Sequence, residues 1–202
     1  MKESKKAEEL IPAQHFGGRM DVCEKLMTTN AAEATARFSK ASEKLLDVNN
    51  WGRLTGLSDF KLMDALGQPT LRSAREQDYI RIDIPGPGTK AGKGYDWVRI
   101  EEIKLVKFTD EEILAMTVRP AAHPTNKRDI PAHFLKRSAT STFIVRRKGL
   151  EISVEEHARN ELINTNQKGL LDNVRNFVVG LTAKIGLSYP QWSVLVKAIL
   201  EK

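Results

Sequence analysis

The sequence contains a single cysteine, Cys23, among its 202 residues. One cysteine cannot form an internal disulfide bond, so the chain fits a reducing compartment, and we predict a cytoplasmic location. No apolar run approaches the roughly 18 residues of a membrane-spanning helix. The first residues are charged and do not contain the apolar segment of a secretory signal. These absences predict a soluble protein with no membrane partner.

The common motifs of catalysis and cofactor binding are also missing. Neither an HExxH pattern nor a cysteine pair indicates a zinc site, and no Gly-x-Ser-x-Gly elbow indicates a serine nucleophile. The glycine-rich loop at residues 85–94 does contain Lys90 and Lys93. A phosphate-binding loop needs Ser or Thr after its lysine and then a helix, whereas Gly94 and a predicted strand follow here. We therefore predict no metal and no cofactor, and interpret the loop as a connection.

The composition, with 41% hydrophobic and 29% charged residues, is typical of an ordinary globular domain. A chain of this length suits one domain with a substantial core. Its first part is polar and is interrupted by Pro12, Gly17 and Gly18. The sequence therefore predicts a flexible leader at residues 1–19, followed by a single domain at residues 20–202.

The first part of that domain has the pattern of an amphipathic helix. We predict the helix over residues 20–46, with Asp21 as its N-terminal cap. It should end at residues 47–51, where Asp and Asn residues precede Trp51, which we expect to be buried. Apolar residues recur at spacings of three and four, as they do on one helix face: Ala31, Ala34, Phe38, Ala41 and Leu45.

Six strands are predicted in the middle of the chain. In residues 79–84 isoleucines alternate with charged residues, which is the period of a strand with one buried face. The pair Glu101 and Glu102 interrupts the alternation of the following strand and predicts a β-bulge. Lys148 and Gly149 mark the turn of the last hairpin. The predicted strands cover residues 60–67, 79–84, 95–108, 113–119, 142–147 and 150–156.

Two helices are predicted after the strands. An apolar stripe runs through residues 168–185, and Gly186 stands where a C-terminal cap belongs. Ser188 and Pro190 then open a second helix. Consecutive strands joined by hairpins make an antiparallel sheet, so the predicted class is α+β: a sheet of about six strands, with one N-terminal and two C-terminal helices packed on it. A pocket is expected between the sheet and the helix at residues 168–185.

The stretch at residues 157–166 gathers most of the candidate binding residues, at a predicted junction between the last strand and a helix. Arg159 has the planar fork that binds a carboxylate or phosphate, and Asn160 stands beside it. Glu161 or His157 is the acid–base candidate. Alternatively, these residues cap and hold the backbone, an interpretation we favour because polar residues at element ends usually do so.

Further candidates lie outside this stretch. Asp96 and Trp97, beside the glycine-rich loop, are candidates for a pocket mouth, although we favour a core position or a lid over the hairpin for Trp97, because large aromatic residues are mostly buried. Arg119 begins a segment, ending at Lys148, that contains eight Lys or Arg residues and one acid, Asp129. Such a segment suits a polyanionic partner. We favour a solvated basic loop, because the segment does not have the interleaved aromatic residues of single-strand binders.

The stretch Asp47-Val48-Asn49-Asn50-Trp51 resembles the START-like, or helix-grip, ligand-binding superfamily, in which a helix often ends near an aspartate, an asparagine and a tryptophan. The chain departs from that pattern because we predict no strand before the helix. The phrases IDIPGPG and GYDWV, and the stretch from HARNE to NFVVG, resemble conserved hypothetical proteins of the Bacteroidetes type. These resemblances imply a bacterial ligand-binding fold and supply no catalytic residue.

We therefore predict a non-catalytic domain that binds a small apolar or anionic molecule, or a protein partner. One alternative is a cyclase-like or hydrolase-like enzyme that uses His157, Arg159 and Glu161 around a cavity. The other is a nucleic-acid binder that uses residues 119–148, whose affinity would fall steeply with salt.

Overall fold

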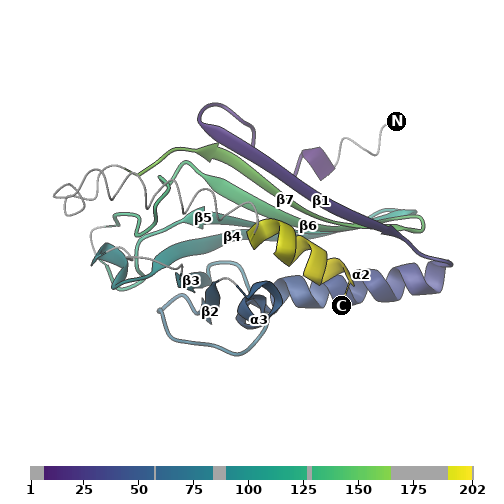
Figure 1. Ribbon diagram of the computed structural model, residues 1–202, viewed down its shortest axis with the longest axis horizontal. Helices are drawn as coiled ribbons and strands as arrows, with labels where there is room; N and C mark the ends of the chain where they lie inside the picture. Colours follow the sequence, from purple (N-terminus) through teal and green to yellow (C-terminus); the bar gives the residue numbers. More distant parts are fainter. Residues whose placement is uncertain (1–6, 57, 84–89, 127–128, 165–190, 202) are drawn as a thin grey trace.

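A computed structural model describes residues 7–56, 58–83, 90–126, 129–164 and 191–201. Seven strands form one antiparallel sheet in the order β1-β7-β6-β5-β4-β3-β2, and helices pack on it (Figure 1). The predicted α+β class is confirmed, with one strand more than expected. The strands are β1 (Gly18–Met27), β2 (Asp59–Met63), β3 (Tyr79–Asp83), β4 (Asp96–Lys107), β5 (Glu111–Pro120), β6 (Thr140–Lys148) and β7 (Glu151–Glu161).

β1 is the additional strand, and it corrects the prediction of a helix that begins at residue 20. Val22 is buried in the main core, and Met20 and Leu26 pack against that core, which is the period of a strand. Glu24 occupies the position between Val22 and Leu26 on the same face. This charged residue interrupts the alternation of apolar and polar residues that would otherwise predict a strand. β1 pairs with β7 along its length. A strand therefore precedes the first long helix after all.

The helix α2 (Ala31–Leu46) begins eleven residues later than predicted. Its cap is Asn30, not Asp21: the Asn30 side chain accepts a hydrogen bond from the Glu33 backbone N–H at 2.9 Å. The Glu33 carboxylate in turn accepts one from the backbone N–H of Thr29 at 2.9 Å. This reciprocal arrangement resembles a capping box. Four members of the predicted apolar stripe are buried: Ala34, Phe38, Ala41 and Leu45.

After α2 the chain turns through two short helices, η1 (Val48–Asn50) and α3 (Trp51–Thr55). Trp51 is 1% exposed, which confirms its predicted burial. The side-chain oxygen of Asn49 accepts a hydrogen bond from the backbone N–H of Leu62 at 3.0 Å. Asn49, which follows α2, thus also holds β2 against the helical layer.

Residues 191–201 form the last described helix and correspond to the second predicted C-terminal helix. The first predicted one, at residues 168–185, lies outside the described residues, as does the pocket expected beside it. A short turn, η2 (Lys90–Gly92), precedes β4. Within the described part of the chain, no helix is long and apolar enough to span a membrane.

Two irregularities that the sequence predicts are confirmed. The pairing of β4 with β5 shifts register between Ile100 and Glu102, where paired glutamates interrupt the alternation. The turn between β6 and β7 contains Gly149 with φ of 58°, a left-handed conformation that glycine adopts without steric cost. Both features come from local sequence, which is why the sequence alone locates them.

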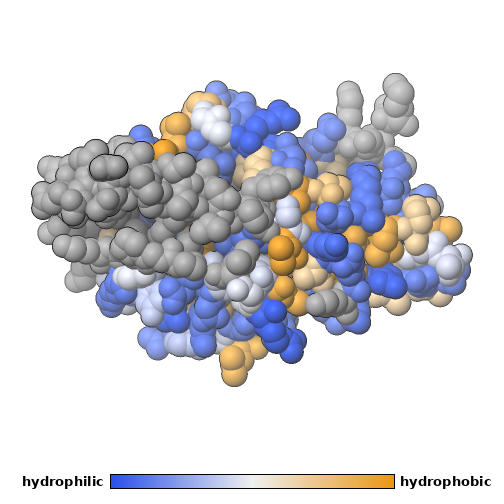
Figure 2. Space-filling model, in the orientation of Figure 1, coloured by the Kyte–Doolittle hydropathy of each residue, from blue (hydrophilic) through white to orange (hydrophobic). Residues whose placement is uncertain are grey.

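The two faces of the sheet differ in chemistry. On the inner face, α2, α3 and the helix at residues 191–201 cover a large apolar core (Figure 1). On the outer face lies a smaller cluster of Ile113, Ala115 and Ile144, covered by the N-terminal residues 7–11. On the face drawn in Figure 2 most of the coloured surface is hydrophilic, and a hydrophobic patch lies near the middle of the view, where the helix at 191–201 lies.

Candidate functional site

A cavity of about 60 Å³ lies between the inner face of the sheet and the start of the helix at residues 191–201. Aromatic rings form much of its wall and contact one another. The ring centroids of Trp51 and Phe60 are 5.5 Å apart, and those of Phe143 and Trp192 are 5.2 Å apart. A mostly apolar hollow with a few polar groups is the usual form of a small-molecule site.

Glu161 is the acidic residue among those that line this cavity. In the pairing of β1 with β7, Gly18 is opposite Glu161 and Met20 is opposite Ala158. β7 therefore has one more residue than β1 over this interval, which is a β-bulge. Asn160, in the bulge, has φ of 57°. A bulge re-aims the side chains that follow it, and here it turns Glu161 to the inner face.

The N-terminal segment of residues 13–17 holds this bulge in place. The Asn160 amide group donates a hydrogen bond to the Ala13 carbonyl at 2.9 Å, and its oxygen accepts one from the His15 backbone N–H at 2.8 Å. Gly17, with φ of +71°, approaches the Glu161 backbone so closely that a Cβ would lie 2.4 Å from the carbonyl oxygen. Only glycine fits there. The segment therefore fixes the direction of the Glu161 side chain.

A second carboxyl, Glu156, is buried on the same face. It is 0% exposed and lies opposite Phe143, a cavity-wall residue, in the pairing of β6 with β7. Within the described residues neither of its oxygens has a hydrogen-bond partner of good geometry. Burial raises the pKa of Glu156 to about 8, and the Ser141 hydroxyl offsets this only in part. With this pKa, Glu156 is mostly protonated at neutral pH. Burial also raises the pKa of Glu161.

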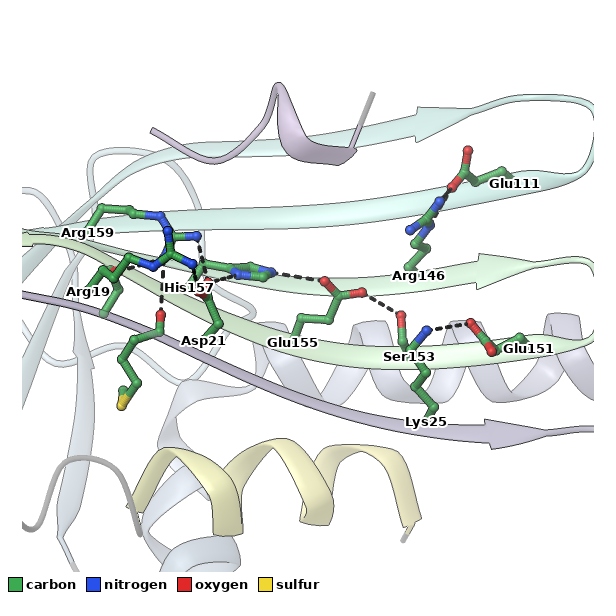
Figure 3. Close-up of polar contacts among 12 residues, drawn as sticks. Arg19, Asp21, Lys25, Glu111, Arg146, Glu151, Ser153, Glu155, His157 and Arg159 are labelled. Carbon is green, nitrogen blue, oxygen red and sulfur yellow. Dashed lines mark hydrogen bonds and ion pairs between the residues drawn. The ribbon is translucent and has the colours of Figure 1, made fainter. Parts of the chain in front are cut away.

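His157 and Arg159 lie on the outer face of the sheet, since Glu155, two residues before His157, is opposite Ile144 of the outer cluster. Figure 3 shows both side chains beside Asp21. Asp21 on β1 lies between them: its carboxylate accepts hydrogen bonds from His157 Nδ1 at 2.6 Å and from Arg159 Nη2 at 2.6 Å. His157 Nε2 contacts the Glu155 carboxylate at 3.0 Å, and Ser153 donates to Glu155 at 2.7 Å. The row of polar side chains runs along β7 and stabilises its pairing with β1.

The predicted trio of His157, Arg159 and Glu161 is therefore divided between the two faces of the sheet. Residues 157–161 belong to β7 itself and not to a junction after it. Regular alternation would place all three side chains on one face, and the bulge at Asn160 turns Glu161 to the other face. Four candidates lie close together in β7: His157, Arg159, Asn160 and Glu161. Glu161 is the one among them that lines the cavity. Asn160 serves the backbone, as the alternative interpretation predicts.

The other candidates lie away from the cavity. Trp97 is buried in a separate cluster with Met63 and Ala132, and its ring nitrogen donates to the Gly92 carbonyl at 3.0 Å. Asp96 is buried at the start of β4. In the predicted basic segment, the described arginines form ion pairs with carboxylates: Arg119 with Glu101, Arg137 with Asp129, Arg146 with Glu111, and Arg147 with Glu112.

Sequence reasoning missed Glu156 and the aromatic wall. Glu156 continues the inward row of Ile152 and Val154, and extending that alternation by two residues places its carboxyl in the core. The rings come from four separate elements and carry no shared signal in the sequence. Among the described residues, no three His, Cys, Asp or Glu side chains lie close enough to hold a metal ion.

No family model and no curated protein sequence matches the chain. Solved structures with a similar arrangement include a hypothetical protein from Helicobacter pylori, with a TM-score of 0.44 and 11% identity over 88% of this chain and 86% of that one. A norcoclaurine synthase mutant from Thalictrum has a TM-score of 0.41 and 8% identity, covering 93% and 98% of the two chains.

A START superfamily protein from Mycobacterium smegmatis has a TM-score of 0.38 and 9% identity, covering 91% of this chain and 95% of its own. Likenesses at these TM-scores and identities carry no conclusion about activity. The function of this chain has to be inferred from its own residues.

Proposed function

We propose that the protein binds a small, largely apolar molecule in the inner cavity and does not transform it. The observation that carries this proposal is an aromatic-walled cavity into which a β-bulge turns one carboxyl group, that of Glu161. The apolar body of the ligand would contact the rings, and a hydroxyl or amine would face the carboxyl. A START-like ligand-binding role in the cytoplasm, as the sequence predicts, agrees with this proposal.

A ligand of ordinary size requires the cavity to expand. The volume of about 60 Å³ is room for only a few water molecules, whereas most ligand sites are several times larger. The last described helix is held at both ends: Ser58 donates to Gln191 at 3.2 Å near its start, and Lys44 donates to the Ile199 carbonyl at 3.0 Å near its end. Trp192 lies at its start and lines the cavity, and we propose that it moves when ligand enters.

A ligand-binding function fits the positions of His157, Arg159 and Glu161 better than an enzymatic function does. A cyclase or hydrolase built on His157, Arg159 and Glu161 needs the three groups around one substrate. The first two are engaged with Asp21 on the outer face. The nucleic-acid alternative is weakened by the ion pairs of the basic segment, because a paired guanidinium releases fewer counterions on binding phosphate.

The proposal is tested with the neutral apolar dye N-phenyl-1-naphthylamine. Saturable dye fluorescence, together with quenching of tryptophan emission, is expected for the wild type. In a Trp192→Phe variant the quenching should shrink, whereas it should persist in Trp97→Phe, because Trp97 lies in a separate cluster. Quenching that depends equally on both tryptophans would place the dye elsewhere and overturn the cavity site.

The role of Glu161 is tested by displacing the dye with decylamine and with decane. Glu161→Gln should weaken decylamine several-fold and leave decane unchanged, because a carboxyl that hydrogen-bonds the ligand is worth about 1 to 3 kcal/mol. Glu151→Gln is the matched control, since Glu151 lies on the same strand but pairs with Lys25 at the surface. Equal effects of the two variants would remove Glu161 from the site.

A further inference from the structure

A second hollow, of about 110 Å³, lies on the outer face of the sheet beside the ends of β3, β4 and β5. Its lining is polar and charged, unlike that of the inner cavity. Three arginines and one tyrosine contribute to it, together with two carboxylates: Arg99, Arg119, Arg137, Tyr79, Glu101 and Asp129. Three positive and two negative charges leave the hollow with a net charge of +1.

Two of the arginines stand directly opposite each other. Arg99 on β4 pairs with Arg119 on β5, and Tyr79 on β3 pairs with Arg99. The three side chains therefore form a row across three adjacent strands. Like charges at directly opposite positions of a sheet repel and destabilise the pairing. A cross-strand arginine pair at the centre of a hollow is thus costly unless a negative charge lies between them.

Glu101 only partly supplies the negative charge needed between Arg99 and Arg119. Its carboxylate accepts a hydrogen bond from Arg119 Nε at 2.7 Å, but Arg99 Nη2 is 3.6 Å from its other oxygen. Within the described residues the Arg99 side chain makes no hydrogen bond, although a guanidinium has five N–H donors. One carboxylate therefore serves two guanidinium groups, and most of the Arg99 donors remain available to a ligand.

The third arginine is held in position by the chain around it. Arg137 binds Asp129 through two parallel contacts, Nη1 to Oδ2 at 2.7 Å and Nη2 to Oδ1 at 2.6 Å. Arg119 Nη1 donates to the Arg137 carbonyl at 2.9 Å. Such forked pairs fix guanidinium geometry. The wall of the hollow is therefore ordered before any ligand arrives.

We propose that this hollow binds a doubly charged oxyanion, either inorganic phosphate or the phosphate group of a small phosphomonoester. The Arg99 guanidinium would bind the anion, and Arg119 would contribute through the N–H donors that Glu101 and the Arg137 carbonyl leave available. The Tyr79 hydroxyl would donate a further hydrogen bond. The volume of about 110 Å³ equals the share of about four water molecules in the liquid, which is room for a tetrahedral anion. The site lies on the opposite face from the inner cavity and does not depend on the proposed binding there.

Titration calorimetry with inorganic phosphate, phenyl phosphate and acetate tests the proposal. Saturable binding of the two phosphates, at least tenfold tighter than acetate, is expected at low salt and should weaken as salt screens the charges. Phenyl phosphate tighter than phosphate would indicate a phosphomonoester as ligand, and the reverse order would indicate the free ion. Equal, non-saturating heats for all three anions would overturn the site.

Two variants localise the binding. Arg99→Gln should reduce phosphate affinity at least tenfold, whereas the control Arg19→Gln, which removes the same charge from an exposed position on β1, should not. Tyr79→Phe leaves the net charge unchanged and should weaken phosphate several-fold. Thermal unfolding checks that each variant is folded. Equal losses in Arg99→Gln and Arg19→Gln would indicate attraction to the net charge alone and would exclude the hollow.

Discussion

The side-chain oxygen of Asn160 accepts a hydrogen bond from the backbone N–H of His15 at 2.8 Å, although 145 positions separate the two residues in the chain. This bond joins the N-terminal segment to the bulge of β7. Because the bulge turns Glu161 to the inner face, the N-terminal segment controls a residue of the proposed binding site without contacting any ligand. The first two predictions concern two polar residues of β7, Asn160 and His157.

Asn160→Gly should lower the free energy of unfolding by about 1 to 3 kcal/mol, because the partners of the amide lose their hydrogen bonds. Asn160→Ala should cost about 1 to 2 kcal/mol more, since alanine is strained at a positive φ. Urea unfolding measures both losses. The variants should also bind decylamine more weakly than the wild type. An Asn160→Gly variant as stable as the wild type would show that the segment does not hold the bulge.

His157 should stabilise the fold only below a certain pH. Burial opposes its charge, but the hydrogen bonds with Glu155 and Asp21 outweigh burial and raise its pKa above 6.5. A raised pKa in the folded state means that the stabilising contribution is complete below pH 6.5 and disappears as the pH rises through the folded value. The neighbouring carboxyls of Asp21 and Glu155 have lowered pKa values, so their contributions disappear in acid.

Urea unfolding from about pH 5 to about pH 9 measures this dependence. The wild type should lose stability on the alkaline side, and His157→Gln should remove that part of the slope. His15→Gln is the control, because the His15 side chain is exposed. An unchanged alkaline slope in His157→Gln would contradict the assignment.

Glu156 should make the protein less stable as the pH rises from about 4.5 to about 8. The folded state keeps a proton that the unfolded chain releases, because burial raises the pKa of Glu156 to about 8. Linkage then lowers the free energy of unfolding by up to about 1.4 kcal/mol per pH unit in that window. Glu156→Gln, which carries no charge, should flatten this slope, whereas Glu151→Gln should keep it. A Glu156→Gln slope like that of the wild type would mean that Glu156 ionises normally.

Cys23 should react slowly with alkylating reagents. Cys23 is exposed as a residue, but partial desolvation of its thiol, followed by the charge of Glu155, raises the pKa of that thiol to about 11. The thiolate is the reactive form, so only about one thiol in ten thousand is ionised at neutral pH. The iodoacetamide rate should rise about tenfold per pH unit up to about pH 10. A reaction rate that levels off near pH 9, as expected for urea-unfolded protein, would contradict the raised pKa of Cys23.

Local periodicity predicts much of the fold. The apolar stripe of α2, the alternation of β3 and the bulge after Ile100 each depend on neighbouring residues, and each is confirmed. β1 was mistaken for helix because Glu24 breaks its inward apolar row. The reciprocal cap of Asn30 and Glu33 was present in the sequence and would have placed the helix start correctly.

The candidate site is predicted less well, because its parts meet only in three dimensions. Residues 157–161 were expected at a loop junction, where His157 and Glu161 can converge. As part of a strand with a bulge, they face opposite sides of the sheet. The opposition of Arg99 and Arg119 depends on the register of β4 and β5, which the bulge between Ile100 and Glu102 shifts by one residue.

The order of the strands leaves β1 and β2 at the two margins of the sheet. Backbone N–H and C=O groups at such margins can pair with a strand of another molecule and seed aggregates. β2 has only five residues, which gives little length for such pairing. β1 is longer but exposes Arg19, Asp21 and Lys25 at alternate positions. A second molecule that added a strand there would have to desolvate these charges, which disfavours pairing at this edge.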